Sequence, residues 1–301
     1  MIYKYTHKTI DKTKYSVCLH QCLNYRIYAE LWYLSIVSPD GYDVLVLNDY
    51  EAVMPIPYQK KLGFKFVIQP IFCQQLGIFY KENVSVEIFN LFLSFLTKYK
   101  VRSYCFNEEN TPYCPSDYLK RDNQVLNLDC DYLTLLNNYN TNKKRVLKNY
   151  SLSNIRIKEK YTGSIVTGLL GKNLNRILLA SQLNILNTLL QELDRKKVLK
   201  QYTLFNKENI PIVYLWLIFS KGRIINLLSI RIKESEIKNS YAYLIDTVIK
   251  NYSNQKLIFD FEGSMIVGIA NFNKSFGATT NHYVFYRNFK WLDKFKNINI
   301  I

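Results

Sequence analysis

The sequence contains no uninterrupted hydrophobic run approaching the roughly 18 residues that indicate a membrane-spanning helix. Its first residues, MIYKYTHKTIDKTKY, carry charges throughout and lack the apolar core of a secretory signal peptide. We therefore expect a cytoplasmic protein without a transmembrane segment. Glycine (10) and proline (7) are also scarce among the 301 residues, so nothing in the composition suggests a collagen-like or wholly disordered chain.

Residues that bind metals or form disulfides are few. Histidine occurs three times, and none of these residues has the spacing of a catalytic triad or a zinc site. Cys18 and Cys22 are four residues apart with His20 between them, but no second ligand pair accompanies them. We predict free thiols and no metal site. The six cysteines are Cys18, Cys22, Cys73, Cys105, Cys114 and Cys130.

Acidic residues are outnumbered: 24 Asp and Glu face 40 Lys and Arg, which gives a net charge of +16. Such a balance is typical of proteins that bind nucleic acid, anionic lipid or phosphorylated ligands. Most of the basic residues are lysine, and Asn, Ile, Tyr and Phe are also abundant, as in AT-rich coding sequences. The charge therefore favours an anionic partner only mildly.

In the first half, strand-like runs alternate with helical patterns, which predicts an α/β or α+β fold. We expect strands at 2–5, at 31–37 and on both sides of the Asn48-Asp49 turn. Residues 11–23 should form a helix capped by Asp11. A second helix is expected over 84–99, with an apolar face at Ile88, Leu91, Phe92 and Phe95.

The second half repeats this order. Thr141 is expected to cap a short basic helix, whose KKRVLK run fits either a solvated face or a ligand contact. Helices are expected over 174–198 and 239–252, and Lys221-Gly222 should form the turn of a hairpin. We read the two halves as a duplication of architecture, in which no sequence repeat is visible.

The segment FDFEGSMIVGIANFNKSFGA, residues 259–278, combines a buried strand with a helix. Strand alternation predicts Asp260 and Glu262 on one face. Gly263 should end the strand, Ser264 should cap the helix, and Gly277 should end it. In the structural interpretation, Asp260 bonds the backbone and Glu262 faces the helix dipole. In the functional one, a carboxylate accepts a proton where a strand opens into a helix N-terminus.

This segment resembles a signature of the FemAB-like peptidyltransferases, which consist of two GNAT-type acyltransferase domains. The matching residues are Asp260, Phe261, Gly263, Gly268, Phe272, Phe276 and Gly277. The family's lysine, which helps to stabilise the acyl carbonyl, falls on Asn273. Lys274 is one position later, and a shift of one residue turns a helical side chain by about 100°.

A closer resemblance is to an uncharacterised bacterial group of GNAT or FemAB-like proteins. They share DFEGS, the tail ending in F-x-K-S-F-G-A, and a run like that of residues 49–79. The segment 141–150 is similar to the basic helix that opens the second FemAB-like domain. The resemblance implies mostly antiparallel sheets flanked by helices, in tandem GNAT-like domains at 1–140 and 141–282. Residues 283–301 are candidates to complete the first domain.

The resemblance further implies an N-acyltransferase that moves an acyl or aminoacyl group to an amine. Asp260 or Glu262 would deprotonate or position the amine, and Lys274 or backbone N–H groups would stabilise the oxyanion. No tightly bound cofactor is expected. The co-substrate would be acyl-CoA, acyl-carrier protein or aminoacyl-tRNA. Neither SKGRIIN nor TGLLGKN has the order of the GNAT pyrophosphate loop, which lowers the expectation of acetyl-CoA.

Further residues are candidates for substrate binding. The amides of Gln74 and Gln75 suit a peptide or a sugar, and Lys60 or Lys61 suits a phosphate. An ordinary polar turn explains the same residues. The remaining candidates are Arg231, which fits a surface ion pair as well, and Gly263 and Ser264 of the motif.

A second hypothesis competes with catalysis. The displaced lysine and the missing pyrophosphate loop are compatible with an inactive GNAT-like module that binds RNA or a protein partner. The sequence leaves the acyl donor, the acceptor and the oligomeric state open.

Overall fold

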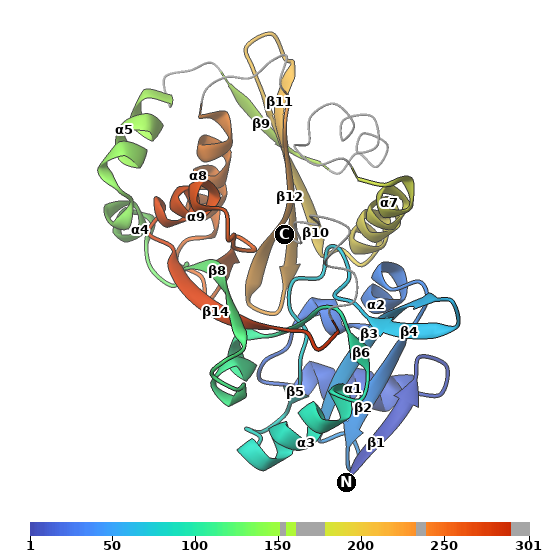
Figure 1. The fold of residues 1–301 in the computed structure, drawn as a ribbon. Helices are drawn as coiled ribbons and strands as arrows, with labels where there is room; N and C mark the ends of the chain where they lie inside the picture. The colour runs from blue at the N-terminus through green and yellow to red at the C-terminus, as the bar shows by residue number, and fades with distance from the viewer. Residues whose placement is uncertain (151–154, 161–177, 233–238, 290–301) are drawn as a thin grey trace. The chain divides into compact units, whose positions relative to one another are not determined.

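The computed structural model describes residues 1–150, 155–160, 178–232 and 239–289. The chain divides into two compact units, residues 1–122 with 282–301, and residues 123–281 (Figure 1). The sequence suggested a boundary between the units at residue 140, whereas the structure places it at residue 122. The GNAT-like domain division itself stays a prediction, and 290–301 of its completing segment lie outside the described residues. None of the described helices has the length and hydrophobicity needed to cross a membrane.

The first unit contains a mixed sheet of order β1-β2-β3-β4-β6, with β5 also paired to β3. Its strands are β1 (Ile2–Thr6), β2 (Tyr42–Leu47), β3 (Ala52–Lys61), β4 (Phe64–Val67), β5 (Phe79–Tyr80), β6 (Lys100–Val101) and β7 (Tyr104–Phe106). Its helices are α1 (Lys12–Gln21), η1 (Ile27–Ala29), α2 (Leu31–Val37), α3 (Val86–Leu96) and η2 (Glu108–Tyr113). The end of β14 (Thr279–Tyr286) pairs with β7.

The strands around the Asn48-Asp49 turn, and the cap of α1 by Asp11, are confirmed. The strand predicted at 31–37 is wrong, because these residues form α2. Aromatic and β-branched residues favoured a strand there. However, Leu31, Leu34 and Val37 recur every three residues, and this helical spacing buries them along with Tyr33.

The helix expected over 84–99 is present as α3, with Ser85 as its N-cap. Its predicted face is only partly correct. Phe89, Phe92 and Leu96 are buried, whereas Leu91 is exposed. Eight of the eleven residues of this helix are apolar, so the sequence pattern fits more than one face, and packing against the unit selects one.

The second unit is built on strands in the order β8-β13-β12-β11-β10-β9. Their bounds are β8 (Leu119–Asn127), β9 (Arg156–Glu159), β10 (Leu199–Phe205), β11 (Pro211–Ser220), β12 (Arg223–Arg231) and β13 (Ile258–Asp260). The helices are α4 (Tyr132–Asn138), α5 (Thr141–Tyr150), α7 (Ala180–Arg195), α8 (Ser240–Tyr252) and α9 (Val267–Lys274). Part of the helix expected over 174–198 lies outside the described residues.

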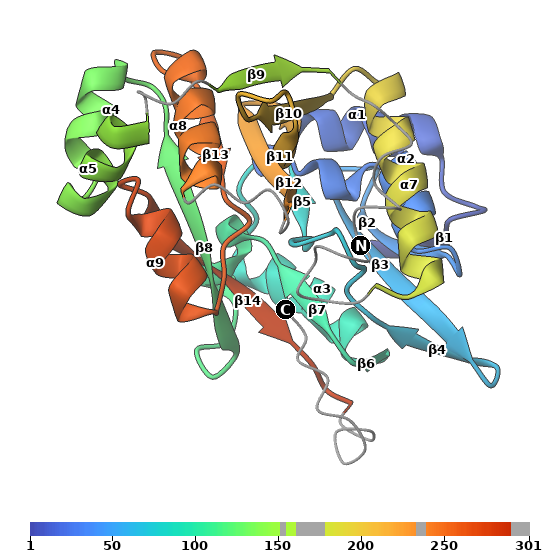
Figure 2. The same cartoon turned by 90° about the horizontal axis from the view of Figure 1, so that it is seen from above.

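Neighbouring strands of this sheet are antiparallel except β12 and β13, which are parallel. The predicted hairpin between β11 and β12 is confirmed. Lys221 and Gly222 both have positive φ, as a two-residue hairpin turn requires. Helices α8 and α7 lie on opposite sides of strands β10 to β12 (Figures 1 and 2). The predicted α+β class, with mostly antiparallel sheets flanked by helices, is therefore confirmed.

Two predicted caps are wrong. The side chain of Asn140, not of Thr141, accepts from the Lys143 N–H and opens α5. Helix α9 begins at Val267, after Ile266, so Ser264 is not its N-cap. The Ser264 hydroxyl instead accepts from the N–H of Ile266 within the preceding turn. Both errors arise because Ser and Thr stabilise turns as readily as helix starts.

Two glycines of the motif should respond oppositely to alanine. Gly277 has a φ of +77°, and an added Cβ would lie 2.9 Å from the Asn138 Cβ and 3.1 Å from its carbonyl oxygen. Gly277→Ala should lower the free energy of unfolding by about 2 kcal/mol. Gly268 lies in α9 with open space around it, so Gly268→Ala should raise that free energy by about 0.5–1 kcal/mol. Urea denaturation measures both, and equal effects would contradict this account.

Candidate functional site

The strand that carries the motif ends in a buried ion pair. Asp260 is 3% exposed, and its Oδ2 lies 2.6 Å from Nη1 of Arg223 on β12. The other oxygen, Oδ1, accepts from the Glu262 N–H at 2.9 Å. Both oxygens of the predicted catalytic carboxylate are therefore hydrogen-bonded by the protein. The pair joins the end of β13 to the start of β12.

The turn after β13 breaks the strand alternation. Glu262 and Gly263 have φ values of +55° and +44°, so the extended backbone ends at Asp260. Glu262 is half-buried in this turn, and it does not continue the strand face of Asp260. The structure brings Asp260, Glu262, Gly263 and Ser264 together within one short segment.

Gln124 is a residue of this site that the sequence did not reveal. It lies on β8 and is fully buried. Its Oε1 accepts from the Ser264 N–H at 3.0 Å and from the Asn273 amide at 3.3 Å, and its carbonyl accepts from the Phe261 N–H. One side chain thus joins the turn to α9. Gln124 and Asn273 are 149 residues apart in sequence, so no local pattern indicates their contact.

Asn273, which stands where the FemAB-like motif has lysine, is 4% exposed and bonded to Gln124. Lys274 is exposed at the next position of α9. Since neighbouring helical residues are about 100° apart, Lys274 does not reach the buried position of Asn273. Two neutral amides therefore occupy the place where the motif predicts a cation.

A cavity of about 280 Å³ lies within the second unit, where α5 and α8 begin and α9 ends. It is lined by Asn140, Asn142, Lys143, Val146, Asn239, Asn271, Phe272 and Ser275. The four asparagines are exposed, so they form the polar mouth of the cavity. Lys143 is buried and Phe272 half-buried, so they form its inner wall.

Lys143 has an unusual environment for a lysine. It is 8% exposed, and its Nζ lies 4.0 Å and 4.2 Å from the ring centroids of Phe272 and Phe276. Burial lowers its pKa to about 8, and the attraction of Asp246 opposes the change only in part. Asp246 is itself buried on α8, and its two oxygens share the proton of the Tyr132 hydroxyl. Burial raises the pKa of Asp246.

Of the two interpretations of the KKRVLK run, the solvated face applies to part of it. Lys144 donates to the Asn137 carbonyl, and Arg145 donates to Asn142. Lys143 instead points into the protein interior.

The parallel pair β12–β13 is short. Only Arg223, Ile224 and Ile225 are in register with β13. On the β11 side, the register passes from Asn226 to Leu228, so Leu227 is a bulge residue without a partner on that strand. Among the described residues, β12 beyond Ile225 has no strand partner on its β13 side.

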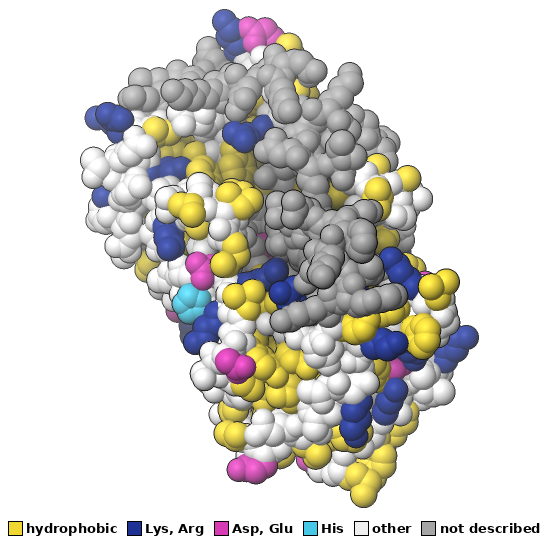
Figure 3. Space-filling model, in the orientation of Figure 1, with side chains coloured by type: hydrophobic (Ala, Val, Ile, Leu, Met, Phe, Trp, Pro, Cys, Tyr) yellow, Lys and Arg dark blue, Asp and Glu magenta, His cyan; other side chains and the backbone are white. Residues whose placement is uncertain are grey.

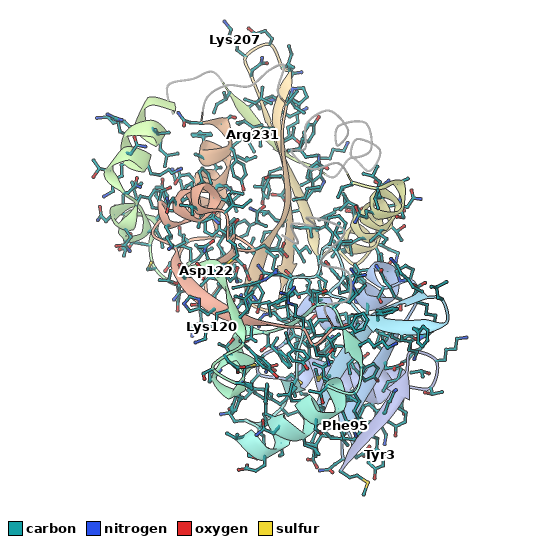
Figure 4. All side chains as sticks on the ribbon, viewed as in Figure 1. Tyr3, Phe95, Lys120, Asp122, Lys207 and Arg231 are labelled. Atoms are coloured by element: carbon teal, nitrogen blue, oxygen red, sulfur yellow. The ribbon has the colours of Figure 1, made fainter. Side chains whose placement is uncertain are left out.

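The remaining predicted binding residues lie in other segments of the chain. Lys60 and Lys61 are exposed at the end of β3, in the first unit. Gln75 is buried in the same unit, where it bonds Gln74 and Glu108. Arg231 is exposed at the end of β12 (Figure 4).

The cysteines and the basic side chains show no specialised cluster in the described part of the chain. All six cysteines are free, and no group of metal-ligating residues occurs there. On the face drawn in Figure 3, Lys and Arg side chains are interspersed with other types and form no single patch.

The ion pair at the end of β13 should be essential for stability. Asp260→Asn should lower the free energy of unfolding by about 3 kcal/mol, because it leaves the buried Arg223 guanidinium without its charged partner. The double variant, Asp260→Asn with Arg223→Met, should lose less free energy of unfolding than the two single variants lose in sum. A urea-denaturation double-mutant cycle tests this, with the exposed Lys274→Met as a near-neutral control. Additive losses would refute the coupling.

Lys143 should destabilise the protein near neutral pH. Its folded pKa, about 8, lies below the ordinary 10.5 of the unfolded chain, so the folded state binds the proton more weakly. Below pH 8, Lys143→Met should therefore raise the free energy of unfolding by about 2–3 kcal/mol. Between pH 8 and 10.5 the wild type loses this proton only when folded, so the advantage should shrink. Lys144→Met is the control, and a pH-independent difference would contradict the prediction.

No family model and no curated protein matches the sequence. Solved structures do match. FemX has a TM-score of 0.66 at 10% identity, covering 97% of this chain and 99% of its own. L-PGS from Bacillus licheniformis has 0.52 at 12% identity, covering 92% of each chain. A tandem GNAT protein from the clavulanic acid biosynthesis pathway has 0.51 at 9%, covering 95% and 97%. The chain therefore shares its fold with FemX and with a tandem GNAT protein, in agreement with the fold that the resemblance of its motif implied.

Proposed function

We propose that the protein is an N-acyltransferase that moves an acyl or aminoacyl group from a thioester or an aminoacyl-tRNA to an amine. The observation that carries the proposal is the parallel pair β12–β13. The pairing stops after three registered residues, where the motif-bearing strand β13 ends, and the next part of β12 contains the bulge at Leu227.

A strand edge without a partner offers backbone N–H and C=O groups in a regular row. An extended chain with amide groups can pair with that row as an added strand does. The bulge turns backbone groups of Leu227 out of the ladder, and an N–H there can donate to a carbonyl oxygen. These features suit a donor whose acyl carbon is presented at the end of an extended arm.

The start of α8 supports a site for the donor's phosphate groups. No side chain among the described residues caps this helix, and Asn239 at its start lines the cavity. Free N–H groups and the helix dipole favour an anion at such a terminus. Both donor classes, acyl-coenzyme A or carrier thioesters and aminoacyl-tRNA, carry phosphate.

In the proposed reaction, the amine attacks the acyl carbon, a C–N bond forms, and the C–S or C–O bond of the donor breaks. Glu262, half-buried in the turn after β13, is the proposed acceptor of the amine's proton. Asp260 has both oxygens engaged, so its proposed role is to hold this turn against Arg223. Lys274 is exposed, and the proposal assigns it no step.

The inactive binding module remains a second candidate function. The observation in its favour is the neutral pair Gln124–Asn273, which lies where the motif has a cation. Such a protein would bind a donor-like molecule or RNA without turning it over.

The test combines binding and turnover. Native mass spectrometry of the full chain with acetyl-coenzyme A and with aminoacyl-tRNA reports which donor binds, and donor deacylation with an added primary amine reports transfer. We expect amine-dependent deacylation of one donor, which Glu262→Gln should slow by roughly 10²-fold. Lys196→Met, at the distant end of α7, should leave it unchanged. Binding without deacylation would favour the inactive module, and no binding of either donor would refute the proposal.

A further inference from the structure

Among the described residues, the Lys143 amine contacts two aromatic ring faces and has no anionic partner at bonding distance. Its Nζ contacts the rings of Phe272 and Phe276, and no hydrogen bond or ion pair of this Nζ occurs within the described residues. Lys144, the next residue along α5, shows the contrast, because its Nζ donates to the Asn137 carbonyl at 2.8 Å. Of these two neighbouring amines, the buried one lines the cavity.

Few charged groups act on this amine. Among the described residues, Asp246 on α8 is the carboxylate that raises its pKa, and the Tyr132 hydroxyl is shared between both oxygens of that carboxylate. Tyr139, directly after α4, is also buried near Asp246, and its pKa is raised as well. Arg145 on α5 bonds Asn142. With a pKa of about 8, roughly one Lys143 amine in ten is uncharged at pH 7, far more than for an ordinary lysine.

We propose that Lys143 is a nucleophilic lysine that takes an acyl group from an activated ester or thioester, which makes it a self-acylation site of this protein. That the acyl group comes from the protein's own donor depends on the proposed function. That the Lys143 amine is nucleophilic depends on its burial in the wall of the cavity, and not on the proposed function.

The chemistry is balanced without a further reactant. The neutral Nζ attacks the acyl carbonyl, a C–N bond forms, and the C–S or C–O bond breaks. The amine's proton leaves with the thiol or alcohol. Amides of Asn142, Asn239 and Asn271 surround the mouth of the cavity, where they can donate to the carbonyl oxygen. The product is an uncharged amide, so acylation removes the unfavourable burial of the ammonium group.

Acylation would also change the cavity itself. A cavity of about 280 Å³ accommodates a small acyl group, which would then occupy space beside Asn239 at the start of α8. Self-acylation therefore competes with occupation of the cavity by another ligand. A neutral acyl-lysine would further remove positive charge from this site.

The experiment compares two neighbouring lysines in one folded protein. The full chain is treated with p-nitrophenyl acetate, which needs no donor site, and separately with acetyl-coenzyme A and with aminoacyl-tRNA. Peptide mapping by mass spectrometry follows acylation at Lys143 and Lys144. With p-nitrophenyl acetate we expect Lys143 to react at least roughly tenfold faster than Lys144. Its rate should rise with pH to a plateau, with a midpoint near 8.

Controls separate reactivity from folding. Lys143→Arg keeps the positive charge and should abolish the fast phase without changing the rate at Lys144, and circular dichroism checks that it folds. In urea the two wild-type rates should converge. Equal rates in the folded protein would overturn the proposal. Fast labelling by p-nitrophenyl acetate with none from either biological donor would keep Lys143 as the nucleophile and count against the proposed acyl donors.

Discussion

The structure around the motif in the second unit depends on the buried ion pair at the end of β13. Asp260 is almost fully buried, and a buried carboxylate is tolerated only when its charge and its hydrogen-bonding capacity are met. Arg223 meets the charge, and the Glu262 N–H meets the remaining oxygen. The second bond requires the chain to turn back at Glu262 and Gly263, both with positive φ. The geometry of the motif's turn, and the entry into α9, follow from this requirement.

Gln124 fixes the other side of the same turn. Its amide oxygen receives one donor from the turn and one from α9, so the turn cannot move away from the helix without leaving buried groups unpaired. This rigidity matters for the proposed chemistry, because Glu262 acts on an amine only if the turn holds it in place. The same network gives a physical reason why Asn273 replaces lysine. An amide donates to the Gln124 oxygen without adding a buried charge.

Lys143, in the wall of the cavity, is in the opposite situation. Lys143 is buried, and no residue in the described part of the chain is a bonded counter-ion for it, an arrangement that costs stability and that folding alone would not favour. Stability lost at one position in this way is common where function needs an altered pKa. Asp260 is fully paired, whereas Lys143 is held against two rings, and this contrast distinguishes a structural charge from the one proposed to be reactive.

The sequence by itself determined what depends on neighbouring residues: the α+β class, the cap of α1 by Asp11, the hairpin at Lys221-Gly222 and the strand–turn–helix of the motif. Each rests on periodicity or on backbone preferences within a few positions. It failed at α2, where strand-like composition competed with helical spacing, and at Ser264, where two local hydrogen-bonding roles are equivalent. Only the tertiary structure decided that Asp260 pairs with Arg223, that Gln124 binds Asn273, and that Lys143 is the buried cation of its run. These contacts join residues far apart in sequence, and burial, which sets their charge and pKa, is a property of the packed chain.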